Sequence, residues 1–76
     1  MNNKDKLIKI LMDINPDLDY EKETGLVDDG LFDSLEVMTI VTEIEDRFNA
    51  DIDPDDVIAE NFNSVEMMLN LIEKEK

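Results

Sequence analysis

Apolar residues in the middle of the chain recur at the i, i+3, i+4, i+7 spacing of a helix, and this pattern constrains the fold more than any other feature. It predicts an amphipathic helix from about Ser34 to Asn49, with Asp33 as its N-cap. The residues expected to face the core are Val37, Ile40, Val41, Ile44 and Phe48.

Two further segments have the same periodicity. The first runs from about Asn3 to Ile14, where Asn2 or Asn3 can cap it and Asn15-Pro16 ends it. The last opens at Asn63-Ser64-Val65-Glu66, a pattern typical of a capping box with Asn63 or Ser64 as the cap. The expected core positions are Leu7, Ile8, Leu11 and Ile14 in the first segment and Val65, Met68, Leu69 and Ile72 in the last.

A short third helix is predicted between these elements, with Asp53 as cap, Pro54 at its first position, and an end near Ala59 or Glu60. The polar connection 16–33 is long for so small a domain, so we expect apolar side chains to anchor it. The candidate anchors are Leu18, Tyr20, Leu26, Val27, Leu31 and Phe32. The predicted fold class is all-α: a four-helix bundle of three longer helices and a short third helix, with a long loop between the first and second, forming a single domain over residues 1–76.

The chain is strongly acidic. It has 7 Lys and Arg against 21 Asp and Glu, for a formal net charge of −14, and Arg47 is the only basic residue between Glu23 and Glu73. Such a surface repels nucleic acid and anionic membranes and attracts basic protein surfaces. Because Lys9 and Asp13 interrupt the N-terminal apolar positions, we expect no signal peptide. No apolar run approaches the roughly 18–20 residues of a membrane span, so we expect no membrane insertion. We expect a cytoplasmic location and a monomer.

Ser34 is the candidate reactive residue. The chain has no His and no Cys, so the usual bases that activate a hydroxyl are missing, and we expect no independent enzymatic activity and no catalytic residue. A serine at the start of a helix is often only a cap. It is also well placed for modification by another enzyme, because the positive end of the helix dipole favours an attached phosphate.

The clustered carboxylates do not form a recognisable metal site. Asp51, Asp53 and Asp55 alternate as the first ligands of an EF-hand do, but Asp56 and Phe62 stand where that loop needs glycine and glutamate. We therefore predict no dedicated metal site.

The residues that follow Ser34 suit a partner-docking surface. Leu35 and Met38 are apolar but lie outside the core stripe, and Glu36 and Glu43 supply negative charge near them. Apolar contacts with a charged rim are typical of protein interfaces, so we expect these four residues to contact partner enzymes that present basic surfaces.

Nearly the whole chain, about Lys4 to Ile72, resembles acyl and peptidyl carrier proteins, and the segment Asp33-Ser34-Leu35-Glu36-Val37-Met38 is similar to the attachment site of that family. The resemblance implies an acyl-carrier-like bundle in which Ser34, flanked by Asp33 and Leu35, receives 4′-phosphopantetheine from coenzyme A. The thiol of this cofactor holds an acyl group as a thioester. The implied partners are a phosphopantetheinyl transferase and enzymes that load and transfer the acyl or aminoacyl group, as in fatty acid or related biosynthesis.

Two alternatives stay open. Gly30 lies four residues before Ser34, which is similar to D-alanyl carriers and to aminoacyl carriers loaded by a stand-alone adenylation enzyme, whereas fatty-acid carriers typically have a glycine three residues before the serine. The alternative from another class is an unmodified acidic domain that binds a basic protein.

Overall fold

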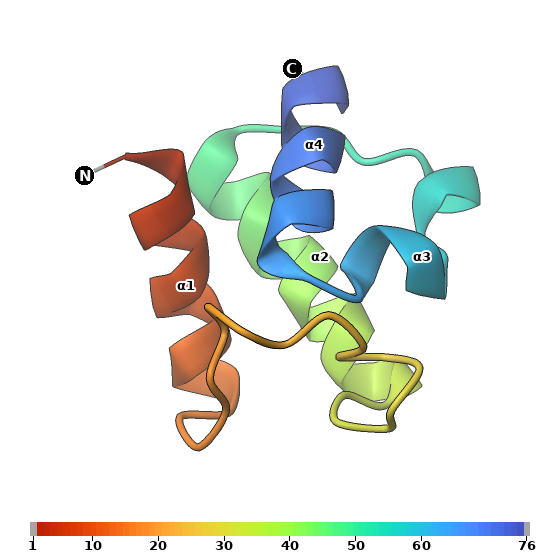
Figure 1. Cartoon of the computed structure of the whole chain (residues 1–76). Coiled ribbons are helices and arrows are strands. Elements are labelled where there is room, and N and C mark those ends of the chain that lie inside the picture. The colour runs from red at the N-terminus through yellow and green to blue at the C-terminus, as the bar shows by residue number, and fades with distance from the viewer. Residues whose placement is uncertain (1, 76) are drawn as a thin grey trace.

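The computed structural model describes residues 2–75 and contains four α-helices in that range, with no strand. The helices are α1 (Asn3–Ile14), α2 (Ser34–Phe48), α3 (Ala59–Phe62) and α4 (Val65–Glu75), and a 3-10 turn, η1, covers Pro54–Asp56. The close helix pairs are α1 with α2, α1 with α4, and α3 with α4 (Figure 1). The predicted all-α bundle of three longer helices and a short one is confirmed. No helix within residues 2–75 is both long and apolar enough to cross a membrane.

A side-chain cap sets the start of α1, and a residue in the left-handed conformation follows the end of α2. The Asn2 side chain accepts a hydrogen bond from the backbone N–H of Asp5 at 2.8 Å, which fixes the start of α1. Asn49 follows α2 in the left-handed conformation with φ 53°, a conformation that asparagine tolerates better than most residues. The predicted bounds of α1 are confirmed, and α2 ends one residue before the expected Asn49.

The core stripe of α2 is confirmed, since all five expected residues are buried. The stripes of the other two long helices needed correction. Ile10 and Leu71 are buried although neither was expected, whereas Ile8, Ile14 and Leu69 are only partly buried. In α1 the buried residues Leu7, Ile10 and Leu11 follow the i, i+3, i+4 spacing, which leaves Ile8 beside the stripe. In α4 the buried face extends toward Leu71, which leaves Leu69 at its edge.

The prediction for the third helix was wrong in extent. Asp53 caps Pro54–Asp56 as expected, with its carboxylate accepting from the N–H of Asp55 at 2.9 Å, but the segment makes only one 3-10 turn. The chain is extended at Ile58, and α3 begins at Ala59 and ends at Phe62. A capped Asp-Pro start therefore produced one turn, because the residues that follow it leave the helical conformation.

The connection 15–33 has no regular helix, yet its apolar side chains anchor it to the bundle. Tyr20, Leu26 and Phe32 are buried, and the rings of Tyr20 and Phe32 stack with centroids 6.2 Å apart. The expected anchoring is confirmed for these three residues and is partial for Leu18, Val27 and Leu31.

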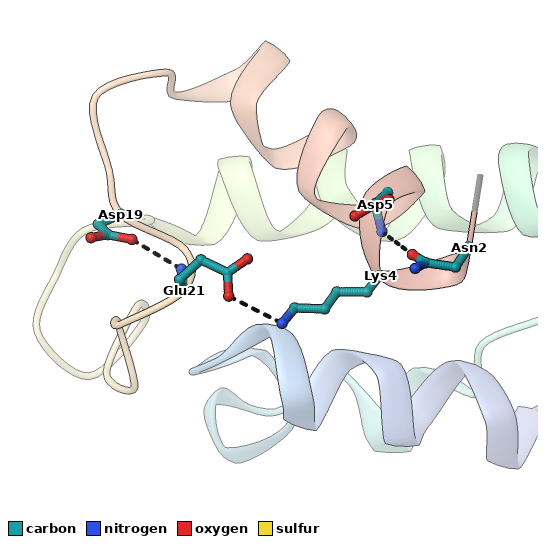
Figure 2. Close-up of polar contacts among 5 residues, drawn as sticks. All are labelled: Asn2, Lys4, Asp5, Asp19 and Glu21. Carbon is teal, nitrogen blue, oxygen red and sulfur yellow. Dashed lines mark hydrogen bonds and ion pairs between the residues drawn. The ribbon is translucent and has the colours of Figure 1, made fainter.

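One exposed ion pair joins the first part of this connection to α1. Lys4 extends from α1 to Glu21, with Nζ and Oε2 3.1 Å apart, while the carboxylate of Asp19 accepts from the N–H of Glu21 (Figure 2). The hydrogen bond and negative charge of Glu21 raise the pKa of Lys4 above its ordinary value. Both partners are exposed, so this pair contributes little to stability.

The start of α4 also differs from the expected capping box. The hydroxyl of Ser64 accepts a hydrogen bond from the N–H of Met67 at 3.2 Å, so Ser64 acts as the cap. Asn63, the other candidate cap, instead binds the loop before α2 with its side chain. The Asn63–Glu66 pairing that the sequence suggested is therefore replaced by a contact between distant segments.

Candidate functional site

Ser34 is the first residue of α2, and Asp33 holds it there. The carboxylate of Asp33 accepts from the N–H of Glu36 at 2.8 Å, and the carboxylate of Glu36 accepts from the N–H of Asp33 at 3.1 Å. This reciprocal capping box fixes the first turn of α2. Ser34 is exposed, and its hydroxyl takes no part in the cap, which leaves it accessible to another enzyme.

A groove of about 480 Å³ opens beside Ser34. One wall is the first turns of α2, and the opposite wall is the segment between η1 and α3, with Val27 of the long connection at one end. The lining is mostly apolar: Val27, Phe32, Asp33, Ser34, Val37, Met38, Val57, Ile58 and Ala59.

A second hollow of about 400 Å³ lies farther along α2. It is lined by Met38, Val41, Glu45, Ile52, Pro54 and Val57. Met38 and Val57 line both hollows, so the hollows adjoin at these two side chains.

The two apolar residues predicted for docking lie on the surface near the serine. Leu35 is 77% exposed and Met38 is 54% exposed, so both side chains are free to contact a partner. Ile58, on the opposite wall of the groove, is 49% exposed and was not singled out from the sequence. The third helix predicted from the sequence included Ile58, and that prediction gave no reason to expect an exposed apolar residue there.

The two acidic residues predicted for docking lie on the other flank of α2. At 100° per residue, Glu36 and Glu43 are about 160° and 140° from Met38 around the helix axis, and neither lines the hollows. Glu36 is tied into the capping box, and Glu43 lies 3.5 Å from the guanidinium of Arg47. The structure therefore does not gather the four residues into one patch. Leu35 lies between the two flanks, with Met38 on one side and Glu36 and Glu43 on the other.

Electrostatics around the site come from carboxylates and from the helix end. Burial raises the pKa of Tyr20 to about 12, and the negative charge of Glu36 adds to this shift. The positive end of the α2 dipole is the compensating feature for an anion at Ser34. Among residues 2–75, no group of three acidic side chains is arranged to hold a metal ion.

These residues fit a covalently attached phosphate with a long arm. The hydroxyl of Ser34 is an exposed nucleophile, the N-terminal amides of α2 favour an anion beside it, and the groove presents apolar surface next to both. An exposed serine of this kind at the start of the central helix of a small bundle is the arrangement expected of a carrier protein.

Residues 5–72 match the protein family described as the phosphopantetheine attachment site, and the chain therefore belongs to the acyl and peptidyl carrier protein family. Its cofactor is covalently attached 4′-phosphopantetheine, and its partners include a phosphopantetheinyl transferase and acyl-handling enzymes. Comparison with curated proteins and with solved structures gave no match.

Proposed function

We propose that Ser34 bears the 4′-phosphopantetheine and that the protein carries an acyl group between partner enzymes. The observation that carries this proposal is the position of Ser34: an exposed hydroxyl on the capped N-terminus of α2, beside an apolar groove. When attached, the cofactor supplies a thiol that holds the cargo as a thioester.

Attachment requires only an accessible nucleophile from this chain. The Ser34 oxygen attacks the pyrophosphate of coenzyme A and forms a new P–O bond, and adenosine 3′,5′-bisphosphate leaves as the old P–O bond breaks. The chain has no His or Cys, so the transferase supplies the base that takes the hydroxyl proton. This division of work agrees with a carrier that is not itself an enzyme.

The apolar lining of the groove supports a hydrocarbon acyl cargo, as in fatty acid or related biosynthesis. Val37, Met38 and Ile58 present methyl and thioether surface to the space beside Ser34. An alkyl chain loses water-exposed surface by lying against such residues, at roughly 25 cal/mol per Å². A D-alanyl or other aminoacyl cargo is the second candidate, supported by the carboxylate of Asp33 in the lining, which attracts an ammonium group.

Leu35, Glu36, Met38 and Glu43 are the residues we propose for partner contact. Glu36 and Glu43 lie on one flank of α2 and Met38 lies on the other. A partner surface therefore has to cover Leu35, which lies between the flanks, to contact both flanks. The expected partner surface is basic, with an apolar recess for Leu35. We expect the protein to act as a single domain over residues 1–76, as a monomer in the cytoplasm.

The sequence offers a matched control for the attachment site, because Ser64 is its one other serine. Ser64 is 9% exposed and its hydroxyl caps α4, so it is much less accessible to a transferase than Ser34. After incubation with coenzyme A and a broad-specificity transferase, intact mass should show one phosphopantetheine on wild type and on Ser64→Ala, and none on Ser34→Ala. No adduct on wild type with several active transferases would favour the unmodified acidic interaction domain.

The cargo can be tested on the modified protein. It should be offered to an acyl-transferring enzyme with a fatty acyl donor, and separately to a stand-alone adenylation enzyme with D-alanine. Acylation from the fatty acyl donor that is faster than loading with D-alanine supports the fatty acyl carrier. Loading only by the adenylation enzyme would overturn it in favour of the aminoacyl carrier.

A further inference from the structure

Asn63 lies between α3 and α4 and binds the loop that leads to Ser34. Its Oδ1 accepts hydrogen bonds from the N–H groups of Val27 at 3.0 Å and Asp28 at 2.9 Å. Its Nδ2 donates to the carboxylate of Asp28 at 2.9 Å, and its backbone carbonyl accepts from the N–H of Leu26 at 2.9 Å. One residue therefore makes four hydrogen bonds to three consecutive residues that are 35 to 37 positions away in the sequence.

The held segment is closed on itself and ends at the attachment site. The carbonyl of Leu26 accepts from the N–H of Phe32 at 2.9 Å, and the carbonyl of Val27 accepts from the N–H of Gly30 at 3.0 Å. Gly30 adopts a φ of +76°, which this tight turn requires and which other residues rarely adopt. Phe32 is buried and directly precedes Asp33, so the segment that ends at Phe32 also fixes the position of Asp33, the cap of α2.

The same segment supplies part of the groove. Val27, whose N–H Asn63 binds, lines the groove together with Ser34. Asn63 does not line it, so any influence on the site passes through the loop.

We infer that Asn63 is a positioning residue for the modification of Ser34, an inference that rests on the function proposed above. It holds residues 25–32 in one arrangement, so that the transferase meets the serine, the cap and the groove wall already in place. Asparagine suits this role because it is at once an acceptor for two amides and a donor to a carboxylate. An aspartate at this position keeps the acceptor, loses the donor and repels Asp28.

This chemistry defines a compensating pair of substitutions. Asn63→Asp should lower kcat/KM for phosphopantetheine transfer about tenfold, mainly through kcat, because it removes a hydrogen bond to a charged group and adds repulsion. Asp28→Asn alone should have little effect, since an amide oxygen still accepts from Asn63. Asn63→Asp combined with Asp28→Asn exchanges donor and acceptor and should restore the wild-type value to within about twofold.

Asn70→Asp is the matched control, because it adds the same charge to an exposed position of α4. All variants are assayed by intact mass at a temperature where circular dichroism shows them folded. If Asn63→Asp does not fold, Asp28→Ala removes only the side-chain contact to Asn63 and should lower kcat/KM about threefold.

Each outcome bears on one proposal or on both. An unchanged rate in Asn63→Asp, or in Asp28→Ala where that variant is used, would overturn the positioning role alone. A double variant as slow as Asn63→Asp would also overturn it, because a general loss of structure is not repaired by the exchange. Absence of any adduct on wild type would overturn the proposed function and the positioning role together.

Discussion

Glu36 has two roles that substitutions can separate. Its carboxylate accepts from the N–H of Asp33 at 3.1 Å in the capping box, and its charge lies on the flank of α2 that we propose meets basic partners. Glu36→Gln removes the charge but keeps an oxygen that can accept from Asp33. Glu36→Ala removes both.

The two variants should therefore differ in stability. Losing half of a capping box costs about 0.5–1 kcal/mol, and in a domain of this size each kcal/mol lowers the melting temperature by about 4–8 °C. Glu36→Ala should melt about 2–8 °C below wild type, whereas Glu36→Gln should melt close to wild type. Thermal unfolding followed by circular dichroism measures both.

The same two variants should agree in partner kinetics. One unit charge at contact distance in water is worth about 1 kcal/mol, so either substitution should lower kcat/KM for the transferase about threefold to fivefold at low salt. The difference in kcat/KM between each variant and wild type should disappear near 1 M salt, where the Debye length falls to about 3 Å. Measuring kcat/KM across salt concentration, with the protein folded throughout, gives this dependence.

Glu73→Gln is the matched control for the loss of charge. Glu73 lies near the end of α4, away from Ser34, and its carboxylate accepts from the side chain of Asn3 at 3.2 Å, a bond that glutamine can keep. Equal losses of kcat/KM in Glu36→Gln and Glu73→Gln would refute a specific docking flank and leave only a bulk charge effect. Equal melting temperatures for Glu36→Gln and Glu36→Ala would refute the structural role of the capping box.

Two further predictions concern the core. Phe62→Ala should lower the free energy of unfolding by about 3–5 kcal/mol, since Phe62 is 0% exposed, and urea denaturation that shows a loss below about 1 kcal/mol would contradict this packing. The pKa of Tyr20 is raised from 10.0 to about 12. Its contribution to the free energy of unfolding is therefore fully present below pH 10 and is lost as pH rises toward 12. Unfolding measured across that range should show wild type losing stability, and a Tyr20→Phe variant with the same slope would exclude Tyr20 as the cause.

The sequence predicted the elements whose causes are local. Asn2 and Asp33 mark helix starts because their side chains bond to backbone amides within the same turn. The stripe from Val37 to Phe48 could be assigned correctly because a helix with one buried face has a simple period. The position of Ser34 on α2 follows from both features.

The remaining parts depend on contacts between distant segments. The local pattern left Asn63 and Ser64 as alternative caps; Ser64 is the cap, and the side chain of Asn63 bonds to Val27 and Asp28 instead. Likewise, the groove wall at Val57 and Ile58 exists because the chain is extended before α3, where Ile58 provides no side-chain cap. Periodicity and capping rules describe neighbours along the chain, so neither feature could be found by them.

The two walls of the groove differ in how firmly they are held, and this affects which cargoes fit. The α2 wall is part of a long capped helix packed on α1, whereas the wall from Val57 to Ala59 connects a single 3-10 turn to a short helix whose close packing is with α4. Local opening of such a segment costs less free energy than unfolding of the bundle. Under the proposed function, the attachment point at Ser34 lies on the firmly held wall, and a bulky acyl group displaces the wall from Val57 to Ala59 at the lower cost in free energy.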